Sequence, residues 1–105
     1  MASLVICCFR PKEGKEAELD QVIADHLPIL RSQGLITDRP GIAMRASDGT
    51  VVEVFEWLSD DAIREAHSNP VVLALWKRYE EASTMLPYGD LPEAKEFFPA
   101  FAPMD

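Results

Sequence analysis

The chain has 105 residues and a mass of 11.7 kDa, which is the size of one ordinary domain, so we expect a single domain over residues 1–105. Hydrophobic residues make up 48% of the sequence and charged residues 27%, which is typical of a folded globular protein and argues against disorder. The formal net charge is -8, and this charge repels both nucleic acid and anionic membrane surfaces. We therefore expect neither as a partner.

Residues 3–10 predict a strand that is covered on both faces, because Val, Ile, Cys and Phe occupy both odd and even positions. Cys7 and Cys8 are neighbours in this strand and point to opposite faces, so they cannot readily form a disulfide. We interpret both as small buried hydrophobic residues, with a reactive thiol as the alternative.

The apolar run within this strand is far shorter than the roughly 20 residues of a membrane helix. It has no basic residue before it and is followed at once by Arg10 and Pro11, unlike a cleaved secretory signal. We therefore expect a cytoplasmic protein.

Two helical regions follow from apolar spacing and capping residues. Apolar positions between residues 19 and 30 recur at helical spacing and predict a first helix that stops near Gly34. Ser59, followed by two acidic residues, is a typical N-cap for a second helix. This helix is interrupted before Pro70, where Asn69 can cap a second segment that continues to about Met85.

Residues 41–46 and 50–58 predict two strands of a hairpin, joined at Ser47, Asp48 and Gly49. A two-residue loop would place Glu53 among apolar side chains, which is costly for a carboxylate without a partner. A three-residue loop makes Arg45 and Glu53 diagonal neighbours that can pair. It places Ile42, Met44, Val52 and Val54 on one face and Ala43, Arg45, Val51, Glu53, Phe55 and Trp57 on the other.

A last strand is predicted at residues 97–101, so the element order is β-α-β-β-α-β. This is the split unit of ferredoxin-like α+β folds, in which helices cover one face of the sheet. We expect the face with Arg45, Glu53, Phe55 and Trp57 to lack a cover within one chain. A second copy should cover it, so the sequence predicts a homodimer.

Four short segments carry a family resemblance: FRPKEGK at 9–15, DGT at 48–50, EW at 56–57 followed by Ser59, and HSNP at 67–70. With these segments the chain resembles small dimeric α+β-barrel proteins of the antibiotic biosynthesis monooxygenase type. The resemblance implies that two sheets face each other and that each subunit has a cavity between its sheet and its helices. Some members of this family oxygenate aromatic polyketides without metal or flavin.

His26 and His67 are the only imidazoles, and each lies beside a proline in a predicted helix. Such irregularities can open pockets, and His exchanges protons near neutral pH. We select His67 as a catalytic base and His26 as a ligand-binding residue. For each, the alternative is a hydrogen-bonded packing residue.

Arg45 is the second catalytic candidate, because with Glu53 it could polarise a phenolate, enolate or carboxylate. The alternative is a cross-strand pair at the rim of the dimer interface. Glu53 is a further ligand-binding candidate, and the candidates that would form the walls are aromatic: Phe55, Trp57, Trp76 and Tyr79.

The sequence lacks the His, Cys and carboxylate spacing of a metal site, and it has no Gly-rich phosphate loop, G-x-S-x-G elbow or C-x-x-C pair. We therefore expect no metal and no other cofactor. Two functions remain open. The first is a homodimer that binds a small apolar or aromatic molecule and oxygenates or isomerises it without a cofactor. The second is a dimeric ligand-binding or interaction module without catalysis.

Overall fold

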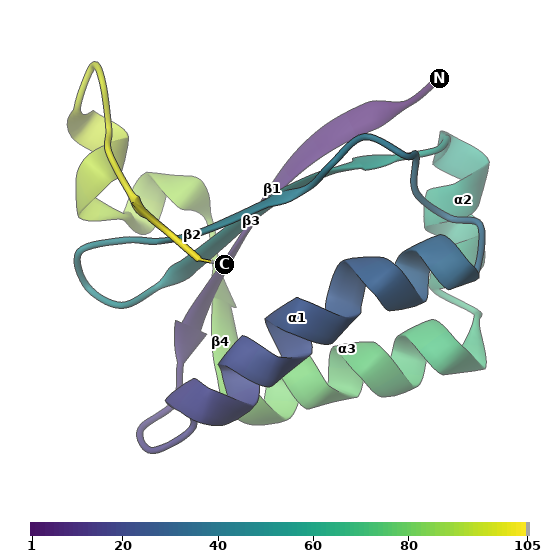
Figure 1. The fold of residues 1–105 in the computed structure, drawn as a ribbon, viewed down its shortest axis with the longest axis horizontal. Helices are drawn as coiled ribbons and strands as arrows, with labels where there is room; N and C mark the ends of the chain where they lie inside the picture. The colour runs from purple at the N-terminus through teal and green to yellow at the C-terminus, as the bar shows by residue number, and fades with distance from the viewer. Residues whose placement is uncertain (105) are drawn as a thin grey trace.

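The computed structural model describes residues 1–104, with an antiparallel five-stranded sheet and three helices. Figure 1 shows α1 and α3 side by side beneath one face of the sheet and the C-terminal segment on the other side. Across the sheet the strands lie in the order β4-β1-β3-β2-β5, and along the chain strands and helices alternate as β-α-β-β-α-β up to β4. The predicted α+β class and split β-α-β-β-α-β order are confirmed. The elements are β1 Ser3–Pro11, α1 Glu16–Ser32, β2 Ile42–Arg45, β3 Val51–Trp57, α2 Asp60–Ala66, α3 Pro70–Ala82, β4 Ser83–Leu86 and β5 Ala102–Pro103.

The hairpin has the predicted three-residue loop. Ala46 N–H donates to the Thr50 carbonyl at 2.8 Å, and Arg45 lies opposite Val51. Gly49 has a φ of 90°, a conformation that other residues rarely adopt. The Asp48 side chain accepts from Thr50 N–H at 2.9 Å, so the loop is held by its own polar residues.

The prediction about which sheet face is covered is wrong. The face with Glu53, Phe55 and Trp57 packs against the helices, and these three side chains are buried. Burial of Glu53 is tolerated because His26 on α1 and Tyr79 on α3 both reach its carboxylate. These partners lie far away in sequence, so hairpin register alone could not reveal them.

The end of the chain also differs from the prediction. The second helical region ends at Ala82 and passes directly into β4, which pairs with β1, so the helix does not reach Met85. The predicted strand at residues 97–101 is absent, and Phe97 and Phe98 are 96% and 93% exposed. No Gly or Pro separates α3 from β4, and the sequence therefore carries no turn signal at this boundary.

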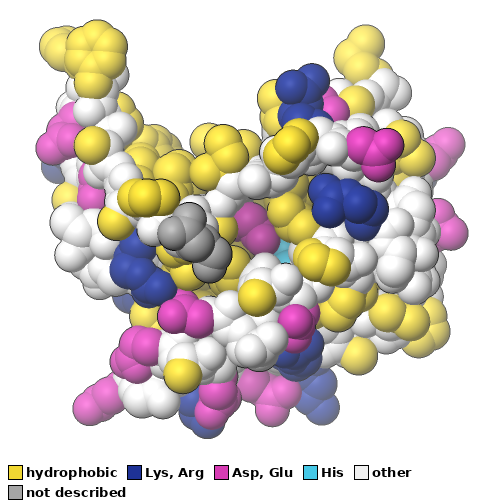
Figure 2. All heavy atoms as spheres, in the orientation of Figure 1, with side chains coloured by type: hydrophobic (Ala, Val, Ile, Leu, Met, Phe, Trp, Pro, Cys, Tyr) yellow, Lys and Arg dark blue, Asp and Glu magenta, His cyan; other side chains and the backbone are white. Residues whose placement is uncertain are grey.

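The sheet face opposite the helices is only partly covered. Two 3-10 turns, Tyr88–Asp90 and Pro92–Lys95, place Leu91 against Cys8 and Val52 in a small second core. Beyond this segment Leu4, Ile6 and Ile42 are 60%, 55% and 58% exposed. Figure 2 shows hydrophobic side chains in the concavity between the C-terminal segment and the N-terminal end of the chain. We call Leu4, Ile6 and Ile42 the open apolar face.

Candidate functional site

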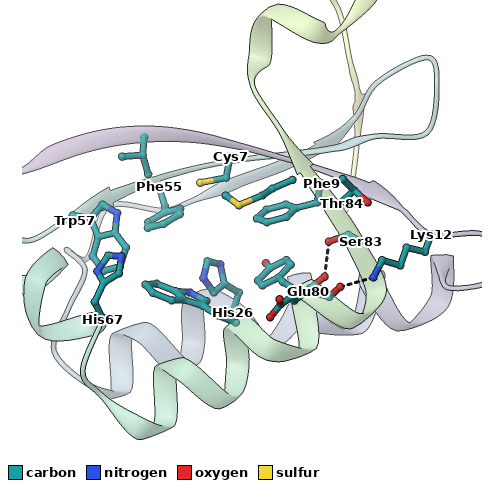
Figure 3. Close-up of a pocket in the computed structure, with 14 residues that line it drawn as sticks. Cys7, Phe9, Lys12, His26, Phe55, Trp57, His67, Glu80, Ser83 and Thr84 are labelled. Atoms are coloured by element: carbon teal, nitrogen blue, oxygen red, sulfur yellow. Dashed lines mark hydrogen bonds between the residues drawn. The ribbon is translucent and has the colours of Figure 1, made fainter.

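A cavity of about 650 Å³ lies between the sheet and the helices (Figure 3). This volume is typical of sites for small molecules. Its walls are mostly apolar, with Val5, Cys7 and Phe9 from β1 and Phe55 and Trp57 from β3. Of the predicted site residues, the lining includes His26, Phe55, Trp57, His67, Trp76 and Tyr79.

His26 is a buried polar residue of this cavity, with 3% exposure on the sheet-facing side of α1. Its Nδ1 lies 2.7 Å from Glu53 Oε1. A carboxylate only accepts hydrogen bonds, so in the neutral imidazole Nδ1 carries the proton and Nε2 presents a lone pair. This Nε2 is buried and has no hydrogen-bond partner within residues 1–104. Glu53 thus fixes the orientation of the ring, and within the described part of the chain Nε2 is left without a partner and closed to solvent.

Glu53 is 1% exposed and receives a second donor on the same oxygen. The Tyr79 hydroxyl donates to Glu53 Oε1 at 3.3 Å, and the Tyr79 ring stacks on Phe9 with a centroid separation of 4.1 Å. Burial and the negative charge of Glu53 raise the pKa of the Tyr79 hydroxyl, so it stays protonated and donates. Helices α1 and α3 thus each supply one hydrogen-bond donor to the Glu53 carboxylate.

His67 occupies the C-cap of α2, at the break that precedes α3. Its Nδ1 donates to the Ile63 carbonyl at 2.7 Å, and its ring lies 5.1 Å from that of Trp76, edge to face. The side chain is exposed, yet it lines the cavity. The predicted break is confirmed: Ser59 caps α2, and Asn69 accepts from Val71 N–H and Val72 N–H.

A row of aromatic rings connects the two histidines along the cavity wall. The ring centroid of Phe55 lies 5.4 Å from that of His26, in an edge-to-face contact, and 5.4 Å from that of Trp57. Trp57 in turn meets Trp76 edge to face at 6.5 Å, and Trp76 contacts His67. Figure 3 shows His26 and His67 at separate positions along this wall. A planar apolar ligand therefore has aromatic surface between two imidazoles.

Arg45 lies outside this arrangement. It donates to Asp20 on α1 at 2.9 Å and is not part of the cavity lining. The predicted pairing of Arg45 with Glu53 is wrong, although the two are diagonal neighbours as expected. Glu53 is instead satisfied by His26 and Tyr79, which are buried beside it, whereas Arg45 extends to Asp20.

Cys7 is a lining residue that the sequence analysis did not select. Burial, followed by the nearby Glu53 and Cys8, raises the pKa of the Cys7 thiol from 9.0 to about 12. A neutral thiol behaves as a small apolar side chain, in keeping with the preferred interpretation of this cysteine. The available signal was strand alternation, which places residues 5, 7 and 9 on one face.

Within residues 1–104, no three His, Cys, Asp or Glu side chains are grouped so that they could hold a metal ion. No helix in the same part of the chain is long and apolar enough to cross a membrane.

Comparison with solved structures finds clear similarity. The structure superposes on that of SnoaB, a cofactor-independent oxygenase from Streptomyces nogalater, with a TM-score of 0.68 and 22% identity over 81% of this chain and 86% of SnoaB. This similarity confirms the ferredoxin-like α+β fold of the single chain that the family resemblance implied. A variant of SnoaB gives a TM-score of 0.66 at the same identity, over 88% of this chain and 97% of the variant. Rv0793 from Mycobacterium tuberculosis gives 0.64 at 19% identity, over 83% and 94% of the two chains.

No family model matches the sequence, and no curated protein matches it. At these identities the structural similarity establishes the fold, and the activity has to be argued from the site itself.

Proposed function

We propose that the protein binds a phenolic aromatic molecule in the cavity and oxygenates it with dioxygen, without a cofactor. The observation that carries this proposal is the buried His26, whose Nδ1 is held by Glu53 and whose Nε2 has no partner within residues 1–104. An imidazole held by a carboxylate is a suitable general base, because the carboxylate stabilises the imidazolium that forms.

The first step is a proton transfer. Nε2 of His26 is buried, so the substrate has to displace the side chains over it; His26 Nε2 then takes the proton of the substrate hydroxyl, and Glu53 stabilises the resulting charge on the ring. The phenolate is electron-rich, and the apolar walls formed by Phe55, Trp57 and Trp76 keep its ring out of water. His26 replaces His67 as the proposed base because it is buried and has a carboxylate partner.

The remaining steps balance with dioxygen as the only oxidant. The phenolate gives one electron to dioxygen, and the two radicals combine at a ring carbon to form a peroxide. His26 returns its proton to the peroxide, the O–O bond breaks, and water leaves with the hydrogen of that carbon. A phenol and dioxygen thus give a quinone and water, and His26 returns to its starting form. Arg45 has no part in this scheme.

We also propose that the protein is a homodimer, formed through the open apolar face rather than the face predicted from the sequence. Leu4 and Ile6 on β1 and Ile42 on β2 lie on either side of β3, where Val54 is opposite both Ile6 and Ile42, and such exposed apolar surfaces usually mark an interface. Antiparallel sheet faces can pack on each other about a two-fold axis.

Oxygen uptake with a panel of phenols and hydroquinones tests the proposed activity. His26→Gln keeps a polar side chain of similar reach but removes the base, so we expect turnover to fall by at least about 100-fold. Arg64→Ala is the matched control, because Arg64 is exposed on α2 and does not line the cavity. Uptake that is equal in His26→Gln and wild type contradicts the mechanism. If panel compounds bind but none of them causes oxygen uptake, the result supports the non-catalytic alternative.

A further inference from the structure

We infer that Phe97 and Phe98 anchor the dimer by packing on the open apolar face of a second copy, beside Leu4 and Ile6 of that copy. We call these two phenylalanines the aromatic tip. The inference rests on the homodimer proposed above and goes beyond it, because it names the side chains of one copy that cover the exposed strand of the other. It leaves the proposed chemistry of the cavity unchanged.

The aromatic tip is not packed within its own chain. The second 3-10 turn ends at Lys95, and the chain returns to the sheet only at β5, which pairs with β2. Between these two points Phe97 and Phe98 are 96% and 93% exposed, so their rings pack on almost nothing in residues 1–104. Two adjacent, fully exposed phenylalanines are unfavourable in water and are typical of a contact surface.

The N-terminal half of β1 is the exposed strand that the aromatic tip can cover. Strand β4 pairs with β1 only from Cys8 onward, so Ser3–Cys7 have β3 as their one neighbouring strand within residues 1–104. Leu4 and Ile6 in this half are 60% and 55% exposed. Val5 lies between them, points to the other face and lines the cavity. A second copy that packs on Leu4 and Ile6 therefore supports a wall of the candidate site from behind.

The shape of the chain brings the aromatic tip and this strand together only between copies. Figure 1 shows the C-terminal segment and the N-terminal end of β1 on opposite sides of the molecule, and Figure 2 shows the hollow between them. When two open apolar faces meet about a two-fold axis along the viewing direction of Figure 1, the two sides are exchanged. Each aromatic tip then lies at the β1 end of the other copy.

The size of the surface also requires the aromatic tip. A specific interface buries about 800 Å² on each partner. The three side chains of the open apolar face are 55–60% exposed and offer on the order of 100 Å² each, which falls well short of this value. A phenylalanine buries about 150–250 Å², so the two rings of the tip contribute at least as much apolar area as the open apolar face itself.

The distribution of charge permits this contact. The chain carries a net charge of -8, so two copies repel each other wherever their acidic surfaces meet. Residues 1–9 and residues 97–104 contain no charged side chain. Contact between these two stretches therefore buries apolar surface without bringing like charges together.

The first test maps the contact by photo-crosslinking. Phe97 is replaced by benzoylphenylalanine in chains labelled with nitrogen-15, which then exchange subunits with unlabelled wild type. We expect mass spectrometry to find labelled position 97 joined to residues 1–9 of unlabelled chains. The same photoreactive residue at Leu73, an exposed position on α3, should give no such product. Crosslinks within one chain, or to other parts of the second copy, overturn the inference.

The second test measures the dimer dissociation constant by sedimentation. In the double variant Phe97→Ser/Phe98→Ser we expect this constant to rise at least about 100-fold, because a few buried anchors carry most of the energy of an interface. Both side chains are exposed in the single chain, so the variant should keep the fold of the protomer. Leu73→Ser is the matched control, since it removes an exposed apolar side chain from the helical side, and its dissociation constant should stay close to that of wild type.

The outcomes separate the aromatic tip from the proposed homodimer. If Ile6→Glu dissociates and the double variant does not, the result contradicts only the role of the aromatic tip. A wild type that is monomeric at micromolar concentration overturns both the homodimer and the inference, and it would leave the tip to a partner of another kind. Oxygen uptake is measured separately and decides neither of these two points.

Discussion

At the scale of single residues, the site depends on one buried carboxylate. Glu53 is 1% exposed and would be strongly destabilising without partners, but His26 and Tyr79 both donate to its Oε1. The same two bonds orient the imidazole for proton transfer. Stability and the proposed chemistry therefore share these contacts.

The variant Glu53→Gln should separate the contribution of Glu53 to stability from its contribution to the proposed chemistry. The amide can still accept from His26 Nδ1, so the fold should persist, but a neutral group does not stabilise an imidazolium. We expect oxygen uptake to fall by about 100-fold with a smaller change in anaerobic ligand affinity. Tyr79→Phe is the companion variant, because it removes one donor to Glu53 and keeps the stacking on Phe9, and its rate should fall much less. Equal losses in both variants would show that the charge of Glu53 is not the deciding factor.

The Cys7 thiol should make stability depend on alkaline pH. Its pKa is raised from 9.0 to about 12 in the folded protein, so the folded state keeps the proton that the unfolded chain releases. The associated stability is complete below the unfolded pKa and is lost as pH rises from 9.0 toward about 12.

Urea unfolding at about pH 8 and about pH 10 measures this effect. Wild type should lose more free energy of unfolding between the two conditions than Cys7→Ala does. Tyr79, whose pKa is also raised, acts in the same direction and is retained in both proteins, so the difference between them isolates Cys7. Parallel losses would contradict the burial of a neutral thiol.

At the scale of elements, the break between α2 and α3 places His67 at the cavity. Asn69 starts α3, because its side chain accepts from Val71 N–H and Val72 N–H. The amide nitrogen of Asn69 also donates to Gln33 Oε1 at 3.1 Å, beyond the end of α1. Asn69 thus links the end of α1 to the start of α3.

Asn69→Ala should lower the free energy of unfolding by about 1–2 kcal/mol through loss of the cap. Asn69→Asp keeps the capping oxygen but loses the donor to Gln33, so it should retain most of that stability. Denaturant unfolding of the three proteins measures both contributions. If the two variants are equally destabilised, the contact with Gln33 and not the cap is the important one.

Sequence patterns predicted the first three strands and the helical regions well, the ends of these elements less well, and the last strand wrongly. Ser59, Asn69 and Pro70 mark the helix starts through local hydrogen bonds, which depend only on near neighbours. The start of β4 lacks such a mark, because Ser83 follows Ala82 with no turn residue. Pairing with β1, which is remote in sequence, makes this segment a strand.

At the scale of the whole molecule, the open apolar face predicts that two copies of the chain assemble into a dimer. Ile6 lies near its centre and is 55% exposed, so Ile6→Glu should fold as a protomer while placing like charges at the interface of two acidic chains. We expect wild type to sediment as a dimer and Ile6→Glu as a monomer.

Leu73→Glu is the matched control, since Leu73 is a similarly exposed apolar residue on α3, on the helical side of the molecule. It should remain dimeric. A wild-type monomer at micromolar concentration, or dissociation of both variants alike, contradicts an interface at the open apolar face.

The sequence by itself determined the element order, the hairpin register and the grouping of its side chains, because alternation and turn chemistry are local rules. It also marked His26 and Glu53, yet not as a pair. These two residues are 27 positions apart, and only the packing of α1 on the sheet brings them together. The same packing decided which sheet face is buried, since a carboxylate is acceptable inside only where distant donors meet it. Tertiary structure thus converted two separately chosen residues into one candidate base.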